Sequence, residues 1–384
     1  MRDIRYLSDI EQVSNLPEQT RRQLARVTEA YRFRANDYYL SLIDWDNPDD
    51  PIRRIIVPDV SELSSVGDLD ASNERSNYVA PGCQHKYPHT ALLICVETCA
   101  SYCRYCFRKR LFMENQKETT RNLEEGLEYI RGNKAISNVL LTGGDPLTLS
   151  TERLEEIIRE LRSMDHVGVI RIGSKTPAFN PYRIIDDPEL PAMLSRYSTR
   201  EKRIYVITHF DVVEELTNVA CLGLDILMKA GVVLTNQTPI IRGANDTPEA
   251  LVKLMGKLSY VGVPPYYFFQ CRPTAGNRPY AVPMAEAYET LEEAKRRVSG
   301  LAKRARYVMS HALGKIEIVG MSRDFFFLKF HRARYQEDEG RFMMFYRNDE
   351  AYWLDDLIPA DGQPHPVHER RGENLTPRVD AVAQ

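Results

Sequence analysis

A regular alternation of short apolar runs and amphipathic helical stretches constrains this chain more than any other feature of its sequence. Six runs rich in Val, Ile, Leu and Tyr resemble buried parallel strands, several of them apolar on both faces. They cover residues 91–97, 138–142, 167–173, 203–209, 232–238 and 265–271. Strand–helix units of this kind predict an α/β fold, either a full or partial β/α barrel or an open doubly wound sheet.

The stretches between these runs carry the helical period. In residues 151–164 one apolar stripe is formed by residues three and four positions apart, namely Leu154, Ile157, Ile158 and Leu161. Further on, Asp246 or Thr247 suits the N-cap of a helix with Pro248 in its first turn. Parallel β/α folds place their sites at the carboxyl ends of strands, so we expect motifs at those ends to converge.

The remainder of the 384 residues predicts appendages to one enzyme-sized domain. Residues 9–35 predict helices without a strand pattern, whereas 315–319 and 325–330 predict strands. The expected divisions are an N-terminal helical extension at 1–80, a barrel at 81–306, a strand-rich segment at 307–358 and a disordered polar tail at 359–384.

The charge balance argues against a nucleic-acid partner. The chain has 51 Lys and Arg against 54 Asp and Glu, and no appended basic domain. No run of apolar residues is long enough for a membrane span. The charged first residues do not resemble a signal peptide, so we expect a cytoplasmic protein.

Three of the seven cysteines form the central motif. Cys99, Cys103 and Cys106 follow the first predicted strand with the spacing C-x3-C-x2-C. Three thiolates can hold three irons of a cubane [4Fe–4S] cluster. The fourth iron then remains open to an outside ligand, which is the arrangement that chemistry at a cluster requires.

Two other interpretations of these cysteines stay open. The first is a structural zinc site, with Cys95 or Cys83 as the fourth ligand. The second is coincidence among ordinary buried cysteines, which is how we interpret the isolated Cys221 and Cys271.

A glycine motif lies one strand–helix unit later. Gly143, Gly144 and Asp145 end the second predicted strand and precede Pro146. Paired glycines let the backbone approach a ligand closely, and the backbone groups there could bind the ammonium group of an amino-acid-like ligand. Gly-Gly-Asp-Pro is also a common turn.

Together these two motifs resemble the radical S-adenosylmethionine (SAM) superfamily, and more closely its lysine 2,3-aminomutase family. The resemblance runs from about Phe33 to about Gly320. Besides the two motifs it rests on residues 38–44, 49–54, 107–110, 171–177, 208–210, 236–238, 242–246, 265–267 and 270–271.

The resemblance implies a partial (β/α)6 TIM-type barrel with an N-terminal helical extension and a C-terminal strand-rich extension. In that family the open iron binds SAM and cleaves it to a 5′-deoxyadenosyl radical, which abstracts a substrate hydrogen. Pyridoxal phosphate (PLP) on a lysine then lets nitrogen migrate between adjacent carbons. The implied partners are a small amino acid or carboxylate substrate and a reductant such as a flavodoxin or ferredoxin; assembly into a homo-oligomer is left open.

The resemblance also assigns residues. It implies that Gly143, Gly144 and Asp145 bind the SAM amino group and that His209 and Gln237 face SAM. Tyr105 takes the often aromatic position between the last two cysteines, and Arg108 matches the arginine that binds the substrate carboxylate. From the residues alone, a surface charge in a basic run is an equal interpretation of Arg108.

The family pattern is incomplete at the lysine that holds PLP. Lys315 is the candidate, but the family's glycine run is reduced here to Gly314. Lys86 and Tyr87 match positions near PLP. The alternative interpretation of Lys315 is an exposed strand lysine.

The pattern also departs at the substrate and at the C-terminus. Arg272 stands where the lysine enzymes carry an aspartate, and no carboxylate stands near Ser310, the second such position. A guanidinium there would repel a lysine ammonium and favour an acidic amino acid; alternatively, Arg272 pairs with a neighbouring acid and faces no ligand. No cysteine follows Cys271, so the family's C-terminal zinc site is absent from the sequence.

Three functions therefore compete. The leading hypothesis is a PLP-dependent radical SAM aminomutase that is not specific for free lysine. The second is a PLP-independent radical SAM enzyme that abstracts hydrogen from another small carboxylate. The third is a zinc-stabilised binding module without catalysis.

Overall fold

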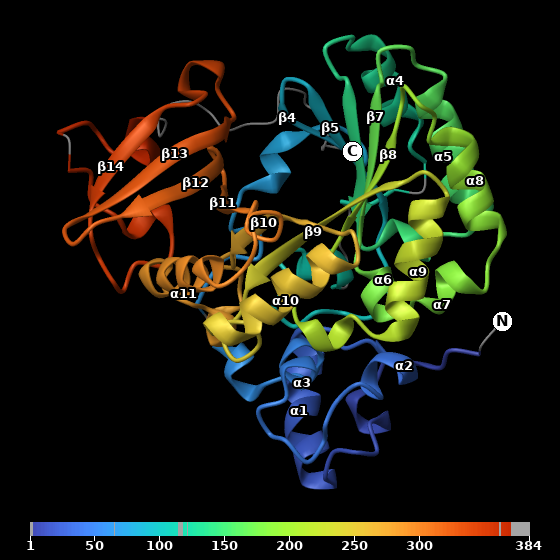
Figure 1. Cartoon of the computed structure of the whole chain (residues 1–384), viewed down its shortest axis with the longest axis horizontal. Helices are drawn as coiled ribbons and strands as arrows, with labels where there is room; N and C mark the ends of the chain where they lie inside the picture. The colour runs from blue at the N-terminus through green and yellow to red at the C-terminus, as the bar shows by residue number, and fades with distance from the viewer. Residues whose placement is uncertain (1–2, 65, 114–117, 121, 361, 370–384) are drawn as a thin grey trace.

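A single sheet of twelve strands organises this computed structural model, which describes residues 3–64, 66–113, 118–120, 122–360 and 362–369 (Figure 1). Seven successive strands pair in parallel and in chain order. They are β5 (Thr90–Val96), β6 (Asn138–Gly143), β7 (Val169–Ser174), β8 (Ile204–Thr208), β9 (Val233–Ile240), β10 (Pro265–Gln270) and β11 (Arg306–His311). The six predicted strands are confirmed, each to within two residues at either end.

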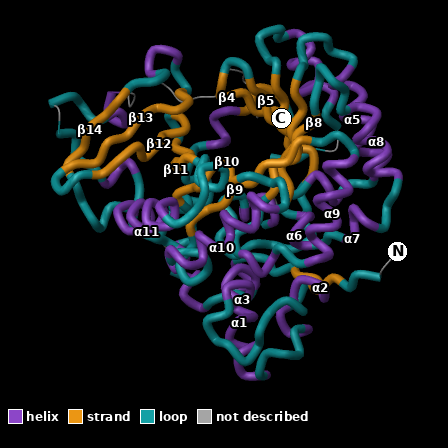
Figure 2. The backbone as a smooth tube through the Cα atoms, in the orientation of Figure 1, coloured by secondary structure: helices purple, strands orange, loops and turns teal. Residues whose placement is uncertain are grey.

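Strand order decides between the predicted architectures. A doubly wound sheet reverses its order at a switch point, whereas β5 to β11 follow one another without reversal. Among the described residues the outer strands β3 (Tyr78–Ala80) and β14 (Phe342–Tyr346) do not pair with each other. The structure is therefore an open, partial β/α barrel, with the strands curving around as Figure 2 shows.

Helices cover the outside of these strands (Figure 2). They are α4 (Glu124–Gly132), α5 (Thr151–Arg162), α6 (Thr176–Phe179), α7 (Tyr182–Ile185), α8 (Glu189–Tyr197), α9 (Asn218–Lys229), α10 (Pro248–Tyr260) and α11 (Met284–Arg296). The predicted stripe of α5 is buried, and the side chain of Ser150 caps this helix by accepting the N–H of Arg153. Of the two candidate caps for α10, Thr247 is the one that accepts a backbone N–H, from Ala250.

The N-terminal extension lies at one end of the barrel (Figure 1). It contains α1 (Glu18–Ala30), α2 (Asp37–Leu40) and α3 (Pro51–Ile56), with a two-stranded pairing of β1 (Tyr6–Leu7) and β2 (Ala35–Asn36). The expectation of helices alone over 9–35 therefore misses the start of β2 at Ala35. Strands β3 and β4 (Cys83–Tyr87) add antiparallel to β5, so the sheet continues across the expected boundary at residue 80.

The C-terminal segment continues the other edge of the sheet. Strands β12 (Gly314–Met321), β13 (Phe325–Ala333) and β14 follow β11 antiparallel, which confirms the two predicted strands. Most of the predicted tail lies outside the described residues, but Pro366–Glu369 form the short helix α12, and Glu369 pairs with Arg341 at 2.6 Å. Short 3-10 helices lie at Ile10–Gln12, Val60–Leu63, Glu74–Asn77, Lys109–Phe112, Pro146–Thr148, Val213–Glu215, Arg278–Tyr280, Gln336–Asp338 and Leu354–Asp356.

Three large clusters of buried apolar side chains support these layers. One lies between the early strands and their helices, one between α11 and the C-terminal strands, and one between the N-terminal extension and the cysteine segment. None of the described helices is both long enough and apolar enough to cross a membrane.

Leu154 tests the packing of α5. Its side chain is fully buried, so we expect Leu154→Ala to lower the free energy of unfolding by about 2–5 kcal/mol. The matched control is Glu156→Ala on the exposed face, whose ion pair with Arg153 is worth less than about 1 kcal/mol. Urea denaturation of the three proteins measures both changes; equal stability of the Leu154 variant and the wild type would contradict the packing.

Candidate active site

One cavity of about 330 Å³ lies inside the barrel and reaches from Thr90, at the start of β5, to the cysteine loop that follows this strand. It is lined by every residue that the sequence analysis assigned to a site. These residues are Lys86, Tyr87, Cys99, Cys103, Tyr105, Cys106, Arg108, Gly143, Gly144, Asp145, His209, Gln237, Arg272 and Lys315. Residues from seven strands or the loops that follow them thus meet in one place, as the barrel architecture requires.

The three motif cysteines lie half-buried in the loop after β5. Burial raises the pKa of each thiol, that of Cys99 well above its ordinary value. Without a cation these sulfurs therefore stay protonated, whereas iron ions would stabilise the thiolates. Three soft donors on one cavity wall fit an iron–sulfur cluster with an open site.

Cys83 and Cys95 occupy other places. Cys83 is fully buried in β4, and Cys95 donates its thiol to the carbonyl of Thr142 at 3.5 Å; both pack in the apolar core of the early strands. Within the described ranges, no three His, Cys, Asp or Glu side chains are grouped to share a single metal ion. The arrangement gives no support to a mononuclear zinc site with either cysteine as fourth ligand, since the ligands of a cubane sit on different irons.

The glycine motif packs directly on the backbone that leads into the cysteine loop. A Cβ on Gly143, which has φ +123°, would lie 2.2 Å from the carbonyl oxygen of Val96, and one on Gly144 would lie 2.4 Å from that of Thr98. The N–H groups of Gly144 and Asp145 donate to these two carbonyls, at 2.7 and 2.9 Å. Close backbone packing therefore already requires both glycines, independently of any ligand.

Asp145 joins the ends of β6 and β7. Its Oδ2 accepts the N–H groups of Lys175 and Thr176 and the hydroxyl of Thr176, at 2.7–2.8 Å, and its Oδ1 accepts the N–H of Leu147 at 3.0 Å. The carboxylate is thus engaged in holding the loops that form the cavity wall.

A second buried acid organises the far side of the cysteine loop. The Asp211 carboxylate accepts the hydroxyl of Tyr105, pairs with Lys175 Nζ at 2.6 Å and contacts His209 Nε2 at 2.9 Å. Lys175 also pairs with Glu215 at 2.6 Å. Lys175 and Asp211 are not among the site residues predicted from the sequence, although Asp211 follows His209 by two residues.

Glu74 forms the third buried acidic centre, and it too is not among the residues predicted from the sequence. Its carboxylate accepts two hydrogen bonds from Arg108, at 3.0 and 3.1 Å, and pairs with Arg110 at 2.9 Å and with Arg272 at 3.2 Å. Burial would raise the pKa of Glu74, but the three guanidinium groups outweigh it and hold the pKa well below its ordinary value.

These contacts decide between the interpretations of the two arginines. Arg108 is buried, and its Nη1 donates to Thr142 Oγ1 at 2.7 Å, so it is not a surface charge. Arg272 pairs with a neighbouring acid, which is the first half of its alternative interpretation, but it also lines the cavity and so lies where a ligand could reach it. Its guanidinium carbon lies 3.8 Å from the centre of the Phe107 ring, which fixes its plane.

Lys315 projects from β12 into the cavity, so the interpretation of an exposed strand lysine is wrong. Its Nζ lies 4.4 Å from the ring centre of Tyr267 and 4.5 Å from that of Phe269. Burial lowers its pKa well below the ordinary value, and nearby cations, Arg171 and Arg272 among them, lower it further. A neutral amine in such a place is a nucleophile suited to a carbonyl cofactor.

A group of basic and phenolic side chains surrounds this amine. Lys86 Nζ donates to the carbonyl of His311 at 2.5 Å, and burial lowers the pKa of Lys86 to about 7. The Arg332 guanidinium lies 4.2 Å from the ring centre of Tyr87. Arg171 and Arg332 line the cavity as further cations that were not predicted from the sequence.

Gly314 is required by packing, since a Cβ there would lie 2.3 Å from the carbonyl oxygen of Arg332.

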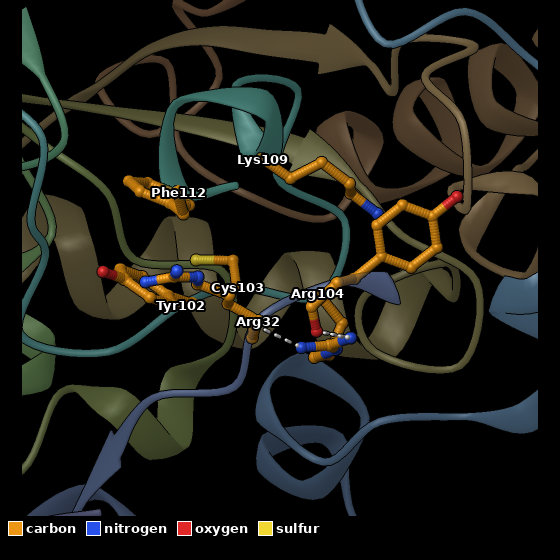
Figure 3. Close-up of a pocket in the computed structure, with 7 residues that line it drawn as sticks. Arg32, Tyr102, Cys103, Arg104, Lys109 and Phe112 are labelled. Carbon is orange, nitrogen blue, oxygen red and sulfur yellow. Dashed lines mark hydrogen bonds between the residues drawn. The ribbon is translucent and has the colours of Figure 1, made fainter. Parts of the chain in front are cut away.

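A small second cavity of about 10 Å³, with room for one water molecule, lies behind Cys103 (Figure 3). Cys103, Arg104 and Lys109 face it from the cysteine loop. Arg104 is buried and pairs with Glu62 of the N-terminal extension at 2.8 Å, while its Nη1 donates to the carbonyl of Arg32 at 3.0 Å. The extension thereby anchors the cysteine loop.

Comparison with known proteins agrees with this geometry. Residues 93–206 match the model of the Radical SAM superfamily. The chain is 51% identical over 354 residues to a putative L-lysine 2,3-aminomutase of Aquifex aeolicus, covering 92% of this chain and 95% of that protein. It is 34% identical to the L-lysine 2,3-aminomutase of Clostridium subterminale (77% and 71% covered) and 31% identical to the glutamate 2,3-aminomutase of Clostridioides difficile (77% and 70%). The chain belongs to the radical SAM superfamily and, within it, to the lysine 2,3-aminomutase family.

Glu74→Gln tests the acidic centre at the arginines. Because breaking a buried ion pair leaves uncompensated charge, we expect the free energy of unfolding at neutral pH to fall by roughly 3–5 kcal/mol. The folded-state pKa of Glu74 is lowered, so its contribution is complete above the pKa of an unfolded-chain glutamate and is lost as pH falls towards the folded-state value. Denaturation at several pH values measures both effects.

The matched control for this prediction is Glu128→Gln, which removes an exposed ion pair with Arg131. It should leave stability within about 1 kcal/mol of the wild type. A Glu74 variant as stable as this control would show that the three arginines do not depend on Glu74.

Proposed function

We propose that this protein is a PLP-dependent aminomutase that cleaves SAM reductively at a cluster held by Cys99, Cys103 and Cys106. One observation carries the proposal: the three cysteines, the glycine loop and the depressed-pKa amine of Lys315 line a single cavity. The cluster and SAM would supply a radical that abstracts hydrogen, and PLP would carry the migrating nitrogen. The protein's own residues bind and orient these groups.

The surroundings of Lys315 support a PLP site. Its amine suits covalent attachment of an aldehyde cofactor. Lys86, Arg171 and Arg332 supply positive charge for a phosphate group, and Tyr87 supplies a hydroxyl. In this proposal these cations bind the phosphate group, which is the role of the glycine run that this chain lacks before Lys315.

The two arginines support an acidic amino acid as substrate. The Glu74 carboxylate accepts hydrogen bonds from Nε and Nη2 of Arg108. The guanidinium has further N–H groups that can donate to a substrate carboxylate. Arg272, stacked on Phe107, places a second cation on the cavity wall, where it would bind a distal carboxylate and repel the distal ammonium of lysine. The relatives include a glutamate 2,3-aminomutase beside the L-lysine 2,3-aminomutases, so enzymes similar to this chain act on an acidic as well as on a basic amino acid.

The electron for SAM cleavage has to come from outside the chain. We place the reaction in the cytoplasm, where the seven cysteines stay reduced, with a flavodoxin or ferredoxin as electron donor. A second candidate function, hydrogen abstraction without PLP, is favoured by the single glycine before Lys315.

The direct test is product analysis. Anaerobic protein is incubated with SAM, dithionite and PLP, and with L-glutamate or L-lysine in parallel, and β-amino acids are detected by NMR. We expect a β-amino acid from an acidic substrate. 5′-Deoxyadenosine without any β-amino acid would favour the second candidate, and no 5′-deoxyadenosine would contradict SAM cleavage itself.

Lys315→Ala tests the attachment of PLP. We expect the variant to lose the PLP absorbance band while it keeps the iron and sulfide of the wild type, because the cysteines are untouched. The matched control is Lys329→Ala, an exposed lysine on β13, which should keep both. Unchanged PLP absorbance in Lys315→Ala would remove this lysine from the role.

Arg272→Asp tests substrate charge. Reversal of the charge on the cavity wall should raise KM for an acidic substrate by about tenfold or more, since a charge-assisted hydrogen bond is replaced by repulsion. Steady-state kinetics with the substrate found above measures the change. An unaffected KM would take Arg272 out of the binding site.

A further inference from the structure

The segment that bears the cysteines also lies against the N-terminal extension. The stretch of the extension that follows α1 is hydrogen-bonded to it at several points. The N–H of Tyr102 donates to the carbonyl of Arg34 at 2.9 Å, and Arg34 Nε donates to the carbonyl of Cys99 at 3.0 Å. Arg104 Nη1 donates to the carbonyl of Arg32 at 3.0 Å. These bonds hold two arginines of the extension directly beside the cysteine segment.

An aromatic pair lies at the same place. The half-buried ring of Tyr102 stacks on Phe112, with ring centres 4.1 Å apart and ring planes inclined by 11°. Cys99 and Cys106 pack against the small apolar cluster that includes Phe112, and Tyr102 lines the small second cavity together with Cys103. Because electron transfer slows steeply with distance, aromatic rings that reach from the surface to the cysteines suit the entry of an electron.

Two permanent positive charges accompany these rings. Arg32 is exposed and Arg34 is half-buried. Burial raises the pKa of the Tyr102 hydroxyl to about 12, the nearby cysteine thiols raise it further, and Arg34 and Arg32 oppose the rise. Both guanidinium groups therefore lie close to the ring, as Figure 3 shows for Arg32. A guanidinium stays charged at every physiological pH, so this place attracts an acidic partner.

The main cavity does not suit an electron donor that is itself a protein. In the proposed reaction the electron is needed when SAM, PLP and the substrate already occupy that cavity. The donor then has to approach the cysteines from outside the cavity. Electron-transfer partners form small, weak interfaces, and charge steers their encounter, so a few well-placed cations are enough.

We propose that the surface formed by Arg32, Arg34 and Tyr102 (the donor surface) docks a small acidic one-electron carrier of the flavodoxin type. In the electron-transfer step the flavodoxin is oxidised by one electron and the cluster is reduced by one electron, and no bond forms or breaks. The inference rests on the proposed function, since it presupposes a cluster on the three cysteines. It concerns the partner, and it requires neither PLP nor a particular substrate.

Arg32→Glu tests the donor surface by direct binding. The side chain of Arg32 is exposed, whereas Arg34 holds the cysteine segment and is left in place. We expect the Kd for oxidised flavodoxin, measured by calorimetry on the holoprotein at low ionic strength, to rise about tenfold, because an attractive charge becomes repulsive. The difference should shrink in 1 M salt, where charges are screened beyond about 3 Å.

Two further variants serve as controls. Arg32→Gln removes the charge without reversing it, so its Kd should lie between those of the wild type and Arg32→Glu. Arg159→Glu reverses an exposed charge on α5, which lies far from α1 in Figure 1, and should leave the Kd unchanged.

Electron delivery gives a second readout. With flavodoxin kept reduced by NADPH and its reductase, 5′-deoxyadenosine formation should slow about tenfold in Arg32→Glu at low ionic strength, in step with the Kd. With dithionite, a small reductant that does not dock, the variant and the wild type should form 5′-deoxyadenosine at equal rates and hold equal amounts of iron.

The outcomes distinguish this inference from the proposed function. Equal Kd values for the wild type and Arg32→Glu, or a wild-type holoprotein that binds no flavodoxin, would overturn the donor surface alone. Slowing of Arg32→Glu with dithionite as much as with flavodoxin would show that Arg32 acts on the site itself and would also overturn it. A wild type that forms no 5′-deoxyadenosine with dithionite would overturn the proposed function and the inference together.

Discussion

The parallel pairing of β5 with β6 is the constraint on which the site depends. In this register Ile94 lies opposite Thr142 and Val96 opposite Gly143. The loop that bears the cysteines and the loop that bears the paired glycines therefore leave the sheet side by side, and their backbones touch so closely that neither glycine could carry a side chain. Each later strand adds its end to the same edge, so the cavity is a consequence of strand order.

Buried acids then arrange an otherwise cationic cavity. Glu74 and Asp211 each hold side chains from two other segments of the chain, and Asp145 holds the backbone that follows β7. Because isolated charges are costly to bury, the basic side chains could not stand so close together without these acids. Burial and the neighbouring cations lower the pKa of Lys315, and no acid among its described contacts offsets them. The same electrostatics therefore fixes the arginines and activates the lysine.

Much of the fold and part of the candidate site could be predicted from the sequence, because the sequence patterns that indicate them are local. The strands follow from apolar runs, the cap at Thr247 from a short motif, and the cysteine spacing from the chemistry of its ligands. Glu74 and Asp211 could not be predicted, since their partners are 34 and 106 residues away, on segments that only the fold brings together. The reason for Gly143 and Gly144 was also hidden, because the close approach is to backbone rather than to a ligand. The burial of Lys315 could not be predicted either, because the alternation of residues along a strand does not distinguish a side chain that faces a cavity from one that faces solvent.

The central claim is that Cys99, Cys103 and Cys106 hold a four-iron cluster with one iron open to SAM. Electron paramagnetic resonance of the anaerobically purified, dithionite-reduced protein, with and without SAM, tests it most directly. The account predicts the signal of a reduced [4Fe–4S] cluster whose g values shift when SAM is added, and loss of that signal in Cys103→Ala. A cluster signal that SAM leaves unchanged, or zinc in place of iron in the purified protein, would contradict it.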